Sequence, residues 1–232
     1  MATDPLDRLD EAGHAALAEV VAMLADDDRA PSSVREPAES WRVHVADSLS
    51  ALEVEELAGA ALIGDVGSGA GFPGLALAAA LSAARVDLIE SIARKCEFAR
   101  LAAERAGLVG VRVVCERAET WAEAAAPEGG REAYDAVTAR AVGRLSTLAE
   151  LASPLLREGG VLVAWKGRRD EAEEAELGRA GERLAMEPVE ARWVGPYAGS
   201  ENRHLHVVRK VGPTPDGLPR RPGMAKKRPF GG

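Results

Sequence analysis

The chain of 232 residues has little of several features that mark specialised classes of protein. Its two cysteines, Cys96 and Cys115, are too few for a disulfide framework or for a zinc site made of cysteine alone. No apolar run approaches the roughly 18 residues of a membrane-spanning helix. The acidic N-terminus lacks the apolar stretch of a signal peptide. His204 and His206 have no third ligand nearby in sequence, so we expect no metal site. We expect a cytoplasmic protein without a membrane anchor.

Charge is unevenly distributed along the chain, although the formal net charge is only −8. Residues 209–232 carry seven cations and one aspartate, a net +6, which leaves residues 1–208 at −14. A basic C-terminus on an acidic body favours local contact with a polyanion such as nucleic acid. The alternative is a solvated terminus with no partner, and charge alone does not separate the two.

Apolar periodicity predicts an α/β fold behind an N-terminal helical cap. Apolar residues at helical spacing within residues 4–26 and 38–57 place this cap over residues 1–58. Short apolar runs then alternate with helical segments, which is typical of a mostly parallel sheet with helices on both faces. The expected strands are 60–66, 86–90, 111–115, 134–138 and 160–165, and the expected helices are 74–84, 92–106, 118–125, 145–153 and 169–185.

The last part of the chain contains two segments that differ from the alternating strands and helices before them. Residues 186–194 and 203–210 read as two strands separated by a turn-rich segment, which predicts an antiparallel hairpin at the end of the sheet. The α/β domain is therefore assigned to residues 59–211. Proline and glycine dominate residues 212–232 without a visible period, so we expect a basic and disordered tail there.

A glycine-rich loop follows the first expected strand. Residues 65–74 read Asp-Val-Gly-Ser-Gly-Ala-Gly-Phe-Pro-Gly. Glycines let backbone N–H groups approach a ligand closely, and a helix is expected directly after Pro73. The loop therefore predicts a pocket for a nucleotide cofactor. A P-loop is excluded, because no Gly-Lys-Ser/Thr sequence follows the glycines.

Two cofactors fit this loop, NAD and S-adenosylmethionine. The loop matches G-x-G-x-x-G, and Glu90, 21 residues after Gly69, is placed to accept from a ribose hydroxyl pair. Asp65 ends the strand before the loop, where a carboxylate suits an amino-acid ammonium and repels a pyrophosphate. The closing hairpin and the lack of a paired Tyr and Lys for hydride transfer also favour S-adenosylmethionine. An NAD-binding Rossmann protein stays open as an alternative.

Several motifs in fixed order resemble one family, the bacterial 16S ribosomal RNA guanine-N7 methyltransferases, also called the glucose-inhibited division protein B family. The matching stretches run from about residue 38 to 210 and are His44-Val-Ala-Asp47-Ser48-Leu49, the loop at 65–74, Glu90-Ser-Ile-Ala-Arg94-Lys95, Arg117-Ala118-Glu119, Thr138-Ala-Arg140-Ala141 and Trp165-Lys166-Gly167. The resemblance implies a Rossmann-like, class I methyltransferase domain over 59–211. It also implies S-adenosylmethionine as methyl donor and a guanine of the small-subunit rRNA as acceptor, in rRNA processing.

The resemblance also implies contacts to the cofactor. The residues expected there are Asp65, Gly67, Gly69, Gly71, Phe72, Glu90, Ala118, Glu119 and Arg140. The glycines would pass close to the methionine part, and Ala118 and Glu119 would lie at the adenine. Phe72 has core packing as its alternative role. Arg140 ends the fourth strand at the ligand crevice and would hold either the cofactor carboxylate or an RNA phosphate, with a surface salt bridge as the alternative.

Five cations are expected to contact RNA: Arg94, Lys95, Arg144, Lys166 and Arg203. Arg94 and Lys95 stand in the first turn of an expected helix, where a cation opposes the helix dipole at a cost of roughly 0.3–1 kcal/mol each. Either an RNA phosphate or pairing with Glu90 or Glu97 would offset this cost. Trp165 next to Lys166 would stack on a base or pack in the core.

No catalytic acid or base is assigned, because guanine N7 carries an in-plane lone pair and no proton to remove. The work expected of the chain is positioning and shielding of the reacting groups. The expected partner is 16S rRNA or the small ribosomal subunit, met by a monomer. A methyltransferase with a small-molecule acceptor stays open as an alternative.

Overall fold

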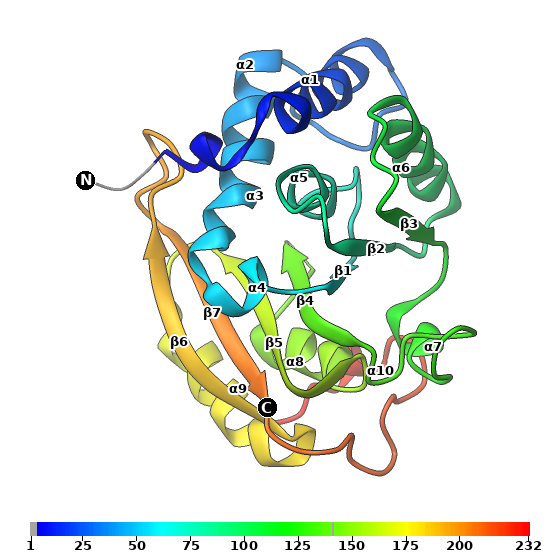
Figure 1. The fold of residues 1–232 in the computed structure, drawn as a ribbon. Coiled ribbons are helices and arrows are strands. Elements are labelled where there is room, and N and C mark those ends of the chain that lie inside the picture. Colours follow the sequence, from blue (N-terminus) through cyan, green and yellow to red (C-terminus); the bar gives the residue numbers. More distant parts are fainter. Residues whose placement is uncertain (1–3, 141) are drawn as a thin grey trace.

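The computed structural model describes residues 4–140 and 142–232 and is built around one seven-stranded sheet. The strand order is β3-β2-β1-β4-β5-β7-β6 (Figure 1). The strands are β1 Leu62–Val66, β2 Arg85–Ile89, β3 Val111–Val114, β4 Tyr134–Arg140, β5 Leu156–Lys166, β6 Met186–Val194 and β7 Arg203–Lys210. Strands β1 to β5 pair in parallel, whereas β7 runs antiparallel to both β5 and β6. The predicted parallel sheet with a closing hairpin is confirmed.

Strand β1 lies at the point where the order of connections reverses. From β1 the chain proceeds outward through β2 to β3, then returns to the other side of β1 as β4. In register, Asp65 pairs with Leu88 of β2 on one side and with Thr138 of β4 on the other. Ligands of open α/β sheets bind outside the carboxyl ends of the strands at such a switch point. The glycine-rich loop leaves β1 at this place.

Helices cover both faces of the sheet. One face carries α1 Glu11–Asp26, α5 Gly74–Ala80 and α6 Ala93–Arg105, and the other carries α7 Ala118–Trp121, α8 Leu145–Ala152 and α9 Glu171–Leu184 (Figure 1). Successive side chains of β5 divide between the two layers: Val161 and Val163 belong to the first core, and Leu162 and Ala164 to the second. This burial on both faces explains why the parallel strands read as continuous apolar runs.

The N-terminal cap is a chain of short helical elements around one long helix. Besides α1 it contains η1 Pro5–Arg8, α2 Pro37–Ser40, the π-helical turn η2 Trp41–Ala46, α3 Asp47–Leu49, η3 Ser50–Glu53 and α4 Glu55–Ala58. Val45, Leu49, Leu52 and Leu57 are buried against the first core, as the apolar spacing predicts. The cap thereby places the polar residues of η2 and α3 beside the carboxyl ends of β4 and β5.

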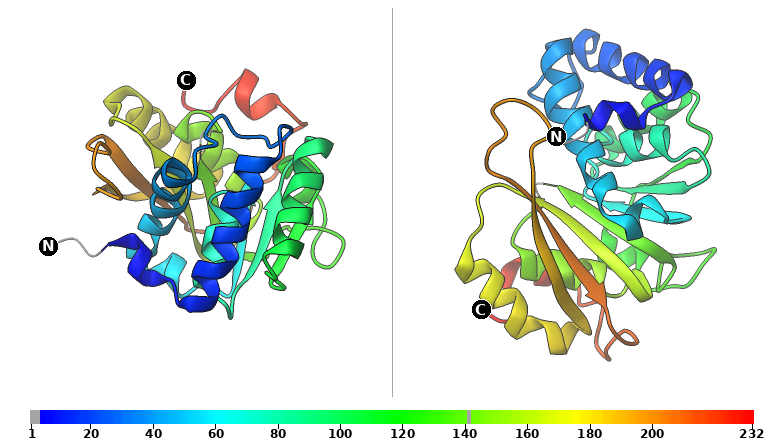
Figure 2. Two further views of the ribbon diagram at one scale, coloured as in Figure 1. Left: turned by 90° about the horizontal axis from the view of Figure 1, so that it is seen from above. Right: turned by 60° about the vertical axis from the view of Figure 1, so that its left-hand side comes forward.

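The C-terminal segment differs from the prediction of a disordered tail. Residues 212–232 run back along the face that carries α8 and α9, and they include the short helix α10 Met224–Lys227 (Figures 1 and 2). Leu218 and Ala225 are buried. The prediction rested on local composition, whereas this segment is held by partners far away in the sequence. Two expected helices are also shorter than predicted: α5 ends at Ala80 and α7 at Trp121.

Candidate functional site at the carboxyl edge of the sheet

The loop after β1 depends on glycine for its own conformation. Gly67, Gly69 and Gly71 have φ angles of 70°, 61° and 97°, a region that favours glycine. A Cβ on Gly67 would lie 2.7 Å from Cγ2 of Val142, and one on Gly71 would overlap the side chain of Leu75. The loop can therefore bring its backbone close to a ligand only while these positions carry no side chain.

Asp65 supports this loop from beneath. Its carboxylate is fully buried; Oδ2 accepts from the backbone N–H of Gly74 at 3.0 Å and Oδ1 from the hydroxyl of Thr138 at 3.0 Å. Burial raises the pKa of Asp65 to about 6. The sequence argument assigned this carboxylate to a cofactor ammonium. The structure instead uses both oxygens to tie the start of α5 to β4, so Asp65 sets the shape of the loop from behind.

Glu90 joins the same loop to the end of β2. Its Oε2 accepts from the N–H of Gly69 at 3.2 Å and its Oε1 from the N–H of Ile92 at 2.9 Å. Nζ of Lys95 lies 3.8 Å from Oε2, so the pairing considered for this lysine is present. Arg94 in the same helical turn is exposed. Each carboxylate oxygen of Glu90 can accept a further bond, which leaves it able to bind a hydroxyl pair.

A narrow groove of about 100 Å³ brings together four residues of the predicted cofactor site, Gly67, Glu90, Ala118 and Glu119. The rest of its lining is Val66, Ile89, Ser91, Glu116, Arg117, Val142 and Leu151. A larger cavity of about 630 Å³ adjoins it and shares Arg117, Glu119, Val142 and Leu151. The carboxyl ends of β1, β2 and β3 thus share one elongated hollow, whose walls carry the three carboxylates of Glu90, Glu116 and Glu119.

Phe72 lies on the other side of the loop. It is buried and stacks on the ring of His44, with the ring centroids 5.1 Å apart and an interplanar angle of 17°. This is the core packing that the sequence left as the alternative, and the groove of Glu90 does not include it. Through this stack, the glycine loop is in direct contact with the helical cap.

Arg140 is engaged by the cap. Its NH1 donates to Oδ2 of Asp47 at 3.0 Å and to the carbonyl of Val43 at 3.1 Å, and its NH2 lies 3.2 Å from Nδ1 of His44. Nε of Arg203 lies 3.4 Å from the other oxygen of Asp47. Arg140 therefore has a salt bridge, but a buried one to the cap, where the alternative expected from the sequence was a surface pair.

His44 and Asp47 were not singled out as site residues from the sequence. Asp47 is buried, and its carbonyl accepts from Nε1 of Trp165 at 2.8 Å, so this tryptophan packs in the core. Nε2 of His44 lies 2.9 Å from the hydroxyl of Ser32. Burial, with the charge of Arg140, lowers the pKa of His44 to about 4. The motif His44-Val-Ala-Asp47 carried the available signal, since both side chains lie one helical turn apart.

Lys166 and Arg144 hold α9 against the same edge. Nζ of Lys166 donates to Oε1 of Glu173 at 2.7 Å and to the carbonyl of Gly143 at 3.0 Å. Arg144 pairs with Glu176. The sheet register sets Lys166 opposite His204, next to Arg203, so these cations of β5 and β7 lie at one edge. Of the five cations predicted to bind RNA, four have a carboxylate partner in the structure.

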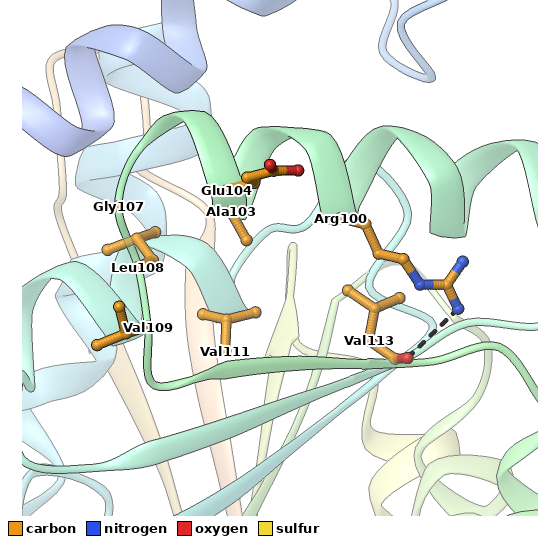
Figure 3. Close-up of a pocket in the computed structure, with 8 residues that line it drawn as sticks. All are labelled: Arg100, Ala103, Glu104, Gly107, Leu108, Val109, Val111 and Val113. Atoms are coloured by element: carbon orange, nitrogen blue, oxygen red, sulfur yellow. Dashed lines mark hydrogen bonds between the residues drawn. The ribbon is translucent and has the colours of Figure 1, made fainter.

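Another hollow lies at the opposite end of β3. This groove of about 320 Å³ is bounded by the C-terminal part of α6 and by residues 107–111 before and at the start of the strand (Figure 3). Its walls are mostly aliphatic, and its polar side chains are Arg100 and Glu104. It lies at the amino end of the strand and meets no part of the glycine loop, so we do not assign it to the cofactor.

Two features are absent from the described parts of the chain, residues 4–140 and 142–232. No helix there is long and apolar enough to cross a membrane. No group of three or more His, Cys, Asp or Glu side chains in the same parts is arranged to hold a metal ion.

The fold is that of the Rossmann-like, class I methyltransferases. The Aquifex aeolicus SAM-dependent methyltransferase is similar in structure, with a TM-score of 0.54 at 16% identity over 84% of this chain and 98% of that one. A mutant of MtNAS solved in complex with S-adenosylmethionine gives a TM-score of 0.56 at 15% identity, over 85% of this chain and 72% of that one. At these identities the likeness is one of fold.

The sequence comparisons are more specific. The family model GidB, described as rRNA small subunit methyltransferase G, matches residues 19–203, and the chain belongs to this family. The relative of that name from Rubrobacter xylanophilus is 44% identical over 85% of this chain and 76% of its own length. The one from Chloroflexus aggregans is 42% identical over 86% and 82%. As a member of the family, the chain is a methyltransferase.

Proposed function

We propose that this protein transfers a methyl group from S-adenosylmethionine to N7 of a guanine in 16S rRNA, by direct in-line attack and without a general base. The observation that supports it most is the groove in which Glu90, Glu119 and the glycine loop meet, in a chain of the small-subunit rRNA methyltransferase family. Glu90 would accept from the ribose hydroxyls, and the backbone at Gly67 and Gly69 would pass beside the methionine part. Ala118 and Glu119 would lie at the adenine.

The residues present fit this donor. A sulfonium cofactor supplies an electrophilic methyl group and carries one net positive charge at neutral pH. The carboxylates that line the groove suit a ligand with a net positive charge, and Glu90 would accept from the ribose hydroxyls of this donor as it would from those of NAD. Glu90 also fixes Gly69 of the loop through a hydrogen bond, so one carboxylate positions both the loop and the bound sugar.

A reaction without a general base would agree with the chemistry of guanine N7. Two titratable groups beside the loop already have partners: both ring nitrogens of His44 are in contact with polar groups, and both oxygens of Asp65 accept bonds from the protein. Since N7 has a lone pair and no proton, the chain needs only to align the acceptor and exclude water.

The cations at the ends of β4, β5 and β7 are the proposed RNA contacts. Arg144, Lys166 and Arg203 lie at the edge of the sheet next to the groove, and Arg94 and Lys95 open α6 on its other side. The partner is 16S rRNA or the small subunit, where phosphate groups would meet these side chains.

The test uses full-length protein with S-adenosylmethionine labelled in the methyl group. Deproteinised small-subunit rRNA and assembled subunits are treated in parallel, and the RNA is digested to nucleosides. We expect label in N7-methylguanosine and in no other nucleoside. Label at another atom would overturn the assignment of guanine N7. Calorimetric binding of S-adenosylmethionine without any RNA labelling would favour the small-molecule acceptor, and binding of NAD alone would overturn the cofactor.

A further inference from the structure

The C-terminal segment, residues 213–230, is fastened to the body of the protein at several points. The carbonyl of Leu218 accepts from NH1 of Arg131 at 3.1 Å, and Arg220 forms a two-point ion pair with Glu150. The ring of Phe230 lies between two guanidinium groups, 4.0 Å from that of Arg220 and 4.3 Å from that of Arg183. These contacts hold a segment with almost no regular structure across α7, α8 and α9.

One contact of this segment reaches a residue of the proposed cofactor site. The backbone N–H of Gly223 donates to Oε1 of Glu119 at 2.7 Å, across 104 positions of sequence. Glu119 is only 8% exposed. Two residues later, the carbonyl of Ala225 accepts from the hydroxyl of Thr147 at 3.2 Å, and Ala225 itself is buried. The segment is therefore seated directly above the carboxylate.

The same segment forms a wall beside the groove. Gly223, Ala225, Lys226 and Lys227 line the cavity of about 630 Å³ whose other side is Glu119. That cavity shares Glu119 with the groove containing Gly67 and Glu90. If the segment were absent, the outer side of Glu119 would open to solvent, and its carboxylate would lose a donor that holds it in position.

We propose that residues 213–230 act as a strap of the cofactor site, positioning the Glu119 carboxylate through the N–H of Gly223 for contact with the adenine of S-adenosylmethionine. This inference rests on the proposed function. A buried carboxylate that loses a hydrogen bond either turns toward water or stays in place without that donor. In both cases the carboxylate must be repositioned when the ligand binds, and this weakens binding. A charged hydrogen bond of about 1.5 kcal/mol corresponds to roughly a tenfold change in Kd.

The test measures Kd for S-adenosylmethionine by calorimetry in full-length variants. Ala225→Asp places a charge at a buried position of the segment, and Phe230→Ala removes its aromatic anchor with less disturbance. We expect Kd to rise about tenfold in the first variant and severalfold in the second. Arg221→Ser is the matched control, because it removes an exposed cation of the same segment and should leave Kd unchanged. Thermal unfolding of each variant confirms that the domain is folded.

A double-mutant cycle separates positioning from general support. Glu119→Ala alone should raise Kd, and adding Ala225→Asp or Phe230→Ala to it should raise Kd no further, because the strap would act through this carboxylate. Additive losses, or an unchanged Kd in both strap variants, would overturn the proposal. If the unaltered protein binds S-adenosylmethionine and the strap variants bind it with the same Kd, only the proposal of the strap is refuted. If the unaltered protein does not bind it, the proposed function itself fails.

Discussion

The carboxyl edge of the sheet has two halves that differ in charge and in what holds that charge. At the ends of β1, β2 and β3 the side chains are acids, and backbone N–H groups hold them: Gly74 and Gly69 donate to Asp65 and Glu90. At the ends of β4 and β5 the side chains are cations, and other side chains hold them, as Asp47 holds Arg140. We call these the acidic half and the basic half.

The difference has a mechanical consequence. A backbone donor moves only if the loop moves, so the acidic half is set once the glycine loop has folded. In the basic half a cation can leave its carboxylate partner for an arriving phosphate, because Arg144 is half exposed, whereas its partner Glu176 is buried and stays bonded to Ser146. The first arrangement suits a small ligand of fixed shape, and the second suits a polyanion whose groups exchange with carboxylates.

The largest expected effect comes from Asp47, which joins the basic half to the cap. Its buried carboxylate faces Arg140 at 3.0 Å and Arg203 at 3.4 Å. Asp47→Ala leaves both guanidinium groups without this partner, and breaking a buried ion pair costs about 3–5 kcal/mol. Urea denaturation measures the free energy of unfolding. Asp28→Ala is the control within the cap, since its exposed pair with Arg35 should contribute at most about 1 kcal/mol. Equal losses in the two variants would contradict the role of Asp47.

The next effect is a pair of opposite pH dependences, one from Asp65 of the acidic half and one from His44 of the cap, which contacts Arg140 of the basic half. Burial raises the pKa of Asp65 from 3.8 to about 6, so the folded protein holds this proton more tightly than the unfolded chain does. Its contribution to stability therefore falls as pH rises from about 4 to 6. The pKa of His44 is lowered from 6.5 to about 4, so its contribution is fully present above 6.5 and is lost as pH falls toward 4.

Two variants separate these contributions. Asp65→Asn can still accept from Gly74 and bond to Thr138, and its stability relative to the unaltered protein should improve by up to about 3 kcal/mol between pH 4 and 6. His44→Gln should show the opposite slope over pH 4 to 6.5, of similar size. The free energy of unfolding measured at several pH values gives both slopes. Slopes of the same sign would contradict the assignment of these titrations to Asp65 and His44.

The fold was predictable from the sequence because its signals are local. The hairpin strands were expected at 186–194 and 203–210 and have these bounds, since alternation and the turn-rich segment between them act over a few residues. The glycine loop and Glu90 were found in the same way. These signals reflect backbone conformation and burial on the two faces of the sheet.

The contacts that complete the site were not predictable, because they join distant parts of the chain. Asp47 and Arg140 are 93 positions apart, and Gly223 and Glu119 are 104 apart. Composition suggested a disordered basic tail, yet Leu218 is buried and Arg220 is paired with Glu150. A proline- and glycine-rich segment has no period to reveal where it packs, so only the folded partner surface determines its course.

In the acidic half, the expected effect is on the affinity for S-adenosylmethionine. Glu90→Ala removes the acceptor for Gly69 and the group proposed for the ribose hydroxyls, and losing one or two such bonds should raise Kd for S-adenosylmethionine about 10- to 100-fold. Glu90→Gln keeps one acceptor oxygen and should give an intermediate Kd in calorimetry. Glu97→Ala, an exposed acid in α6, is the control. A Kd for Glu90→Ala that equals the control value would remove Glu90 from the cofactor site.

The smallest expected effect concerns the ion pairs of the basic half. It tests whether an RNA phosphate replaces the carboxylate as the partner of a cation there. Glu173→Gln keeps an oxygen for the N–H of Leu145 but removes the charge that holds Lys166, so RNA affinity should rise severalfold. Lys166→Ala should lower affinity and reduce the slope of log K against log salt by about 0.7, the value for one phosphate of a single strand. Filter binding over a salt series measures both. If Glu173→Gln also lowered affinity, the pair would serve to fix the shape of the edge, and phosphate exchange at Lys166 would be contradicted.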